Sequence, residues 1–162
     1  MLQQSCPNRD HFVAEMLVPV SAPIRRGPIA KAPVMMHLDH STVPAVVLVV
    51  EDEMLLRMRA VDMVEDAGYT SVEAVDADQT IAVLESRSDI DLLFTDIQMP
   101  GQMDGLKLAH AVHKRWPPIK IILVSGQLKL TTTDIPADSQ FFGKPLAAAA
   151  MIAEMRSMIG QA

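Results

Sequence analysis

The chain has 162 residues, of which 49% are hydrophobic and 21% are charged, and its 14 Lys and Arg residues against 20 Asp and Glu give a net charge of −6. This length favours a domain with a sizeable core, and the acidic balance argues against direct binding to nucleic acid. No apolar run approaches the roughly 18 residues of a membrane-spanning helix, and the single cysteine, Cys6, excludes an internal disulfide and predicts a cytoplasmic location.

Residues 1–44 differ in composition from the rest of the chain. They contain six of the eleven prolines and carry four Lys and Arg residues against three Asp and Glu, so the negative net charge lies in the remaining residues. Proline breaks both helices and central strands. We therefore predict a Pro-rich, disordered N-terminal extension over residues 1–44 and a folded domain over residues 45–162. A translation start at Met35 or Met36 is an alternative explanation of this boundary.

Apolar runs predict the strands of the folded domain. The first run, residues 46–50, is unbroken and rich in β-branched residues, as expected for a strand that is buried on both faces of a parallel sheet. Similar runs follow at residues 70–75, 92–95, 119–124 and 140–142. The sequence therefore predicts five strands.

Between these strands, apolar residues recur at helical spacing. Gly68 is placed to end the first helix, Asp76 or Asp78 can cap the second, and Asp104 can cap the third. A closing helix is expected after the last strand. Residues 126–139 contain a threonine run and a proline and make a poor helix. We therefore expect the fourth helix, between the last two strands, to be short, irregular or missing.

This alternation predicts an α/β fold with right-handed crossovers, in which an open parallel sheet carries helices on both faces. Ligands bind such sheets at the carboxyl ends of the strands. The residues found there are Glu51, Asp52 and Glu53 after the first strand, Asp96 after the third, Ser125 and Gly126 after the fourth, and Lys144 and Pro145 after the last. We therefore expect carboxylates, a hydroxyl and an amine to meet at one edge of the sheet.

This set of groups favours phosphoryl chemistry with a divalent cation. Carboxylates from Glu51, Asp52 and Asp96 would repel one another unless a cation lay between them. Oxygen ligands without His or Cys select Mg²⁺, and a carboxylate beside Mg²⁺ can attack phosphorus to give an acyl phosphate. Lys144 would neutralise the transferred group, and the Ser125 hydroxyl could donate a hydrogen bond to it.

Four segments in this order resemble the receiver domain of two-component response regulators. They are VLVVEDE at residues 47–53, LLFTDIQMPGQMDGLKLA at residues 92–109, VSG at residues 124–126 and FFGKP at residues 141–145. The resemblance covers about residues 45–160 and implies a flavodoxin-like fold whose five parallel strands lie in the order 2-1-3-4-5. It also implies a receiver of the stand-alone type, because the 18 residues after Lys144 suffice for a final helix and for no output domain.

The resemblance further implies which residues do the chemistry. Asp96 would accept a phosphoryl group from a sensor histidine kinase or a histidine phosphotransfer protein. Mg²⁺ would be held by the side chains of Glu51, Asp52 and Asp96 and by the backbone carbonyl of Gln98. The chain would then be a phosphoprotein of a phosphorelay, with Mg²⁺ as its cofactor.

The resemblance also implies a switch. Ser125 would be the switch hydroxyl, Lys144 the lysine that binds the phosphoryl group and Phe141 the switch aromatic, and the Lys144–Pro145 bond would be cis. Three features depart from the usual family pattern. The loop after Asp96 is one residue longer, and the residue at position 141 is often a tyrosine, so its hydroxyl is missing here. The poor fourth helix lies on the face that receivers use for dimers and targets.

The leading hypothesis is therefore a phosphoacceptor that relays phosphate, acts as a phosphate sink or binds a target protein when phosphorylated. It would not be an enzyme beyond self-phosphorylation and autodephosphorylation. The alternative is a receiver-like protein-binding module that works without phosphorylation, although the complete set of acidic, Ser and Lys residues weighs against it. A Mg²⁺-dependent aspartyl phosphatase is a third possibility, but the first strand lacks its DxD pattern. His110 and His113 are interpreted as surface residues because no third metal ligand accompanies them.

Overall fold

The computed structural model describes residues 43–127 and 130–160 of the chain. Its elements are, in order, β1 (Val46–Val50), α1 (Met54–Asp66), β2 (Thr70–Ala74), α2 (Ala77–Ser86), β3 (Leu92–Asp96), α3 (Gly105–Arg115), β4 (Lys120–Ser125), β5 (Ser139–Gly143) and α4 (Ala148–Ile159). All five predicted strands are present, and each predicted boundary lies within one residue of the observed one. The predicted N-terminal extension, except for Val43 and Pro44, lies outside the described residues, as do Met35 and Met36.

The five strands form one parallel sheet in the order β2-β1-β3-β4-β5. This order confirms the predicted flavodoxin-like α/β fold. The chain moves outward from β1 to β2 and then crosses to the other side of β1 to form β3, so the strand order reverses between β1 and β3. Ligands bind open sheets beside such a reversal, at the carboxyl ends of the strands. The fold therefore directs attention to the residues that follow β1 and β3.

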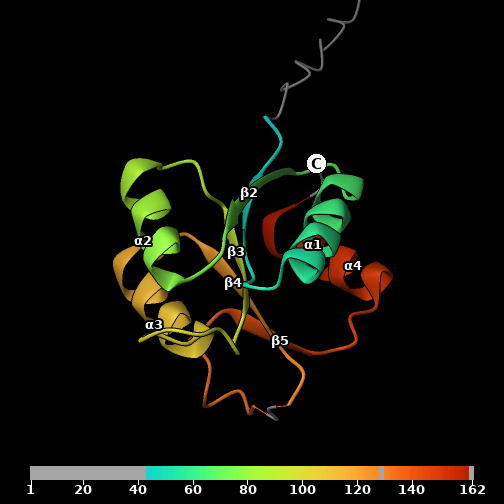
Figure 1. Ribbon diagram of the computed structural model, residues 1–162. Coiled ribbons are helices and arrows are strands. Elements are labelled where there is room, and N and C mark those ends of the chain that lie inside the picture. The colour runs from blue at the N-terminus through green and yellow to red at the C-terminus, as the bar shows by residue number, and fades with distance from the viewer. Residues whose placement is uncertain (1–42, 128–129, 161–162) are drawn as a thin grey trace, which may run out of the picture. The chain divides into compact units, whose positions relative to one another are not determined.

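Alternate residues of β1 pack against different pairs of helices. Val46, Leu48 and Val50 belong to a hydrophobic cluster that includes residues of α2 and α3, whereas Val47 and Val49 belong to a second cluster with residues of α1 and α4. Side chains of a strand point alternately to the two faces of the sheet. Figure 1 shows the result, with α2 and α3 on one side of the sheet and α1 and α4 on the other. Strand β1 is thus buried on both faces, as its unbroken apolar sequence predicts.

The helix ends follow the predicted capping residues. The Asp76 side chain accepts a hydrogen bond from the Gln79 backbone N–H at 2.7 Å, and the Asp104 side chain accepts one from the Lys107 backbone N–H at 2.8 Å. Each cap satisfies an N–H group that the helix leaves unbonded. Gly68, with a φ of 93°, follows the end of α1. None of the helices in the described ranges is long and apolar enough to cross a membrane.

The segment between β4 and β5 contains no helix within its described residues, 126–127 and 130–138, which confirms the prediction of a short or missing fourth helix. A turn takes its place. The backbone N–H and the hydroxyl of Thr131 donate to the Asp134 carboxylate at 2.8 and 2.7 Å, and these hydrogen bonds lower the pKa of Asp134. The ring Nε2 of His110, which is exposed on α3, lies 3.0 Å from the Asp134 carbonyl oxygen. This histidine therefore contacts a loop and no acidic cluster.

Candidate functional site

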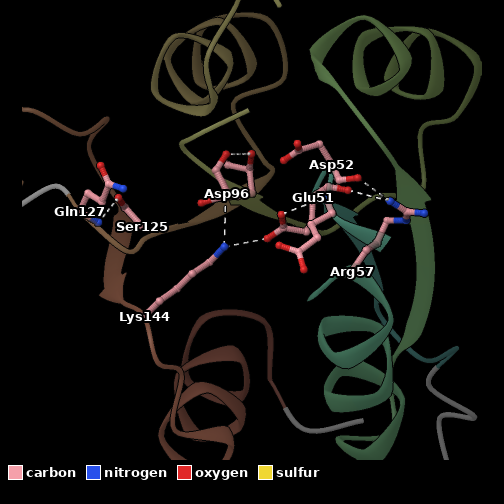
Figure 2. Close-up of polar contacts among 9 residues, drawn as sticks. Glu51, Asp52, Arg57, Asp96, Ser125, Gln127 and Lys144 are labelled. Atoms are coloured by element: carbon pink, nitrogen blue, oxygen red, sulfur yellow. Dashed lines mark hydrogen bonds and ion pairs between the residues drawn. The ribbon is translucent and has the colours of Figure 1, made fainter. Parts of the chain in front are cut away.

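The predicted site residues come from four strand ends and meet at one edge of the sheet. Glu51 follows β1 directly, Asp96 and Ser125 are the last residues of β3 and β4, and Lys144 follows β5. Parallel strands place their carboxyl ends at the same edge, so residues up to 93 positions apart in the chain come into contact here. Figure 2 shows the Lys144 side chain reaching towards the carboxylates of Glu51 and Asp96.

Three carboxylates form a close cluster at this edge. One oxygen each from Glu51, Asp52 and Asp96 lies within 4.8 Å of the others. Glu51 and Asp96 are 4% and 5% exposed, whereas Asp52 is open to solvent. The Oδ1 atom of Asp96 is buried and has no hydrogen-bond partner among the described residues. Buried polar atoms in native proteins are nearly always bonded, so this oxygen fits the position of a ligand to a hard cation with oxygen ligands. The cluster could therefore hold a metal ion.

Lys144 balances part of the negative charge of this cluster. Its Nζ lies 2.8 Å from Glu51 Oε2 and 3.2 Å from Asp96 Oδ2. Burial raises the pKa of Glu51, and the charge of Asp96 raises it further, although the hydrogen bond from Lys144 acts in the opposite direction. Burial lowers the pKa of Lys144, but the hydrogen bond to Glu51 and the two carboxylate charges outweigh it, so that the pKa lies above its usual value. The lysine is therefore held in its charged form at neutral pH.

The comparisons with known proteins agree with this geometry. The sequence model of the protein family described as the response regulator receiver domain matches residues 47–156 of the chain. The chain belongs to the response regulator receiver family. The match begins in β1 and extends into α4, so it includes all the strand ends that form the site.

Its relatives include proteins of different lengths. The chain is 36% identical over 99 residues to the sensor kinase CckA of Brucella abortus, which covers 60% of the chain and 10% of CckA. It is 29% identical over 116 residues to the response regulator receiver protein CpdR of the same organism, covering 70% of the chain and 95% of CpdR. The crystal structure of a receiver protein from Sinorhizobium medicae is similar with a TM-score of 0.67 and 25% identity over 72% of this chain and 94% of that one. The chain spans less than half of the length of several curated relatives.

The remaining predicted site residues lie on β4 and β5 or in the loops that follow β3 and β5. Ser125 is 1% exposed, and its hydroxyl oxygen accepts a hydrogen bond from the Gln127 backbone N–H at 3.2 Å. The Lys144 backbone N–H donates to the Ser125 carbonyl at 2.8 Å, and the Lys144–Pro145 bond is cis, as the resemblance implied. Phe141 is half-buried on β5 against the hydrophobic cluster of α2 and α3. Gln98 is exposed in the loop after β3, and the role assigned to its carbonyl stays a prediction.

The structure adds residues that the sequence did not single out. Arg57 of α1 binds the backbone of the loop that carries Glu51 and Asp52. Gly105, the first residue of α3, lies so close to the backbone of Asp96 that it has no space for a side chain. Gly105 could have been found from the sequence, because it directly follows the predicted cap Asp104 and a glycine at a helix start often marks a close approach of two backbones. Arginine is common on exposed helix faces, so no local pattern marked Arg57.

Three apolar side chains are also exposed in the first turns of α1, which begins two residues after Asp52. They are Met54, Leu55 and Met58, at 60%, 61% and 53% exposure. Exposed apolar side chains gathered in one place often mark an interaction surface. The helical spacing of α1 could have revealed them, because they fall outside the inward-facing positions Ala60 and Val64.

Lys144→Met should destabilise the receiver in the absence of divalent cations. The variant leaves Glu51 and Asp96 buried without their countercharge, and we expect the free energy of unfolding at pH 7 to fall by about 1–3 kcal/mol. Losing the lysine hydrogen bond raises the folded-state pKa of Glu51 further above its ordinary value of 4.5. The folded protein then binds this proton more tightly than the unfolded chain does, so the loss should shrink as the pH falls from 7 towards 4.5.

Urea denaturation in EDTA at pH 7 and pH 5 measures this effect. The matched control is Lys114→Met, which removes the same charge from an exposed position on α3 and should change stability little. Equal stability of the Lys144→Met protein and the unmodified protein at pH 7 would show that the lysine does not compensate the carboxylates.

Proposed function

We propose that this receiver accepts a phosphoryl group on Asp96 from the phosphohistidine of a sensor kinase or of a histidine phosphotransfer protein. Mg²⁺ would be held by Glu51, Asp52, Asp96 and the backbone carbonyl of Gln98. The environment of Asp96 is the observation that carries the proposal: its buried Oδ1 has no partner among the described residues, while its Oδ2 lies 3.2 Å from Lys144 Nζ. A carboxylate that one cation orients and whose other oxygen accepts no hydrogen bond from the described residues suits a nucleophile at a metal site.

In the reaction, a carboxylate oxygen of Asp96 forms a bond to phosphorus while the P–N bond of the phosphohistidine breaks. The imidazole leaves with the electron pair of that bond and takes up a proton. A bound Mg²⁺ would supply neutralisation of charge on the phosphoryl oxygens. Lys144 already contacts Asp96 and can balance the new negative charge, and the Ser125 hydroxyl can donate a hydrogen bond to a phosphoryl oxygen from the neighbouring strand.

Phosphorylation would change the population of two conformations. The phosphoryl group adds negative charge and acceptor oxygens at Asp96, which favours a state with Ser125 drawn towards it. Phe141 on the adjacent strand β5 is half-buried and can respond to that movement. A target protein that binds one state more tightly would report the change. The chain would therefore relay phosphate, act as a phosphate sink or bind a target when phosphorylated.

The donor in this proposal is a protein. Met54, Leu55 and Met58 form an exposed apolar surface beside Asp52, which a protein donor could cover while presenting its phosphohistidine to Asp96. A binding module that works without phosphorylation is not favoured, because it would have no use for a buried carboxylate with an oxygen that no described residue hydrogen-bonds. The absence of enzymatic activity towards other substrates and the cytoplasmic location both remain predictions.

Labelling with a small phosphodonor tests the proposal. The full chain is incubated with acetyl phosphate and Mg²⁺ and then examined by intact mass spectrometry. We expect one adduct, about 80 Da heavier than the chain, that hydroxylamine removes and that EDTA prevents from forming. No adduct at any Mg²⁺ concentration would contradict the proposal, and repeated turnover of phosphomonoesters would indicate a phosphatase instead. A phosphorylated histidine kinase should label the chain faster than acetyl phosphate does.

A further inference from the structure

Arg57 lies in the first turn of α1, but its guanidinium is directed back towards the loop between β1 and α1. Its side chain is only 15% exposed. The Nη1 atom donates to the Glu51 carbonyl at 2.9 Å and more weakly to the Asp52 carbonyl at 3.5 Å (Figure 2). Its Nε donates to the Glu73 carboxylate of β2 at 3.0 Å. One side chain thus joins the loop that carries two of the clustered carboxylates to the neighbouring strand.

These contacts bear directly on the position of Asp52. Within the described residues, no hydrogen bond reaches the Asp52 carboxylate, so the backbone conformation is what limits the positions that this carboxylate can take. The two peptide groups on either side of Asp52 are both held: the carbonyls of Glu51 and Asp52 accept from Arg57, and the N–H of Glu53 donates to Glu51 Oε1 at 3.3 Å. Fixing both neighbouring peptide planes fixes the direction of the Cα–Cβ bond between them.

Holding a loop in this way affects a cation through conformational entropy. Ordering the backbone costs conformational entropy, and binding is stronger when the backbone is already ordered in the free protein. The charge of Arg57 acts in the opposite sense, because a positive guanidinium near the carboxylates repels a cation. The positioning effect and the charge effect of this residue therefore differ in sign, which makes them separable.

We infer that Arg57 is a positioning residue for the proposed Mg²⁺ site. It holds the peptide groups on both sides of Asp52, and Glu73 in turn holds the guanidinium. This inference rests on the proposed function, since it concerns the same metal site. It assigns to Arg57 and Glu73 a part in metal binding although neither contributes a ligand.

Calorimetric titration of the full chain with MgCl₂ tests the inference. Arg57→Ala should weaken Mg²⁺ binding about tenfold, the order expected when the support of a ligand is removed. The matched control is Arg59→Ala, which removes the same charge from an exposed position on the same helix and should leave affinity unchanged or slightly higher. Affinity in Arg57→Ala equal to or higher than that of the control would overturn the inference.

Two further variants keep the test decisive if Arg57→Ala does not fold. Arg57→Lys keeps the charge, but one ammonium cannot bind both the Glu51 carbonyl and Glu73, so we expect an intermediate loss of affinity; full affinity would overturn the inference. Glu73→Gln should weaken binding more in the otherwise unmodified chain than when combined with Arg57→Lys, because the lysine keeps only part of the anchor. An equal effect in both backgrounds would indicate charge alone and would also overturn it.

The outcome for the unmodified chain separates this inference from the proposed function. If the unmodified chain binds Mg²⁺ and Arg57→Ala binds it equally well, the metal site stands and the positioning role is wrong. If the unmodified chain releases or absorbs no heat with Mg²⁺ and its melting temperature does not change with the ion, the metal site itself is wrong and the inference is wrong with it.

Discussion

Asp96→Asn is expected to abolish labelling of this receiver by acetyl phosphate, with a fall in rate of at least about 1,000-fold. An amide nitrogen or oxygen is a poor nucleophile, and the variant also removes one charge from the carboxylate cluster. The neighbouring carboxylates do not offer a substitute of equal quality. Both oxygens of Glu51 accept hydrogen bonds, one from Lys144 and one from the Glu53 N–H, whereas Asp96 Oδ1 has no partner among the described residues, and Asp52 is open to water.

Asp104→Asn is the matched control for this experiment. It makes the same chemical change at a partly exposed helix cap, where asparagine serves as well as aspartate. We expect the control to be labelled at the rate of the unmodified chain, and intact mass spectrometry over a time course measures both. A normal labelling rate in Asp96→Asn would show that another residue accepts the phosphoryl group, and peptide mapping of the adduct would identify that residue.

Gly105→Ala should be the most destabilising single-methyl change at the site. A Cβ at this position would lie 2.8 Å from the Asp96 carbonyl carbon and 2.8 Å from Ile97 Cα, and closer still to the Asp96 carbonyl oxygen. These are backbone atoms of β3 and its exit, so they cannot turn aside as a flexible side chain would. Alanine gains up to about 1 kcal/mol over glycine inside a helix, but we expect the overlap to cost about 2–4 kcal/mol, so the steric effect wins.

Chemical denaturation of Gly105→Ala beside Gly143→Ala measures that cost. Gly143 is the last residue of β5, and a Cβ there would meet no atom within 4 Å, so its replacement should change stability little. We also expect Gly105→Ala to label more slowly, because the displaced backbone is that of Asp96, the proposed phosphoacceptor. Equal stability of the two variants would mean that α3 can move away from β3 without loss.

The strands and the acidic edge could be predicted from the sequence because local pattern determines both. The unbroken run of residues 46–50 is apolar at every position, and a strand with this sequence buries both of its faces only when helices cover both sides of the sheet. Once the strands are known, parallel pairing alone brings Asp96 and Lys144 to the same edge. The contact between them can then be predicted, because the lysine side chain is long enough to span the distance.

The roles of Arg57 and Gly105 could not be predicted in the same way. The hydrogen bond from Arg57 to the Glu51 carbonyl depends on how α1 leaves the loop, and the ion pair with Glu73 depends on the register of β2 beside β1. The need for glycine at position 105 depends on how close α3 comes to β3. Each depends on packing between elements, and the periodicity of residues within one element carries no information about that packing.

The crowded carboxylates have a consequence for the protein as a whole. Like charges that are kept out of water oppose folding. Without a bound cation, the receiver therefore has a lower free energy of unfolding than its hydrophobic core alone would give. An ion that binds only the folded chain shifts that threshold in proportion to the logarithm of its free concentration. The melting temperature of such a chain then depends on the free concentration of that ion in the solution, and it does so in the unphosphorylated protein.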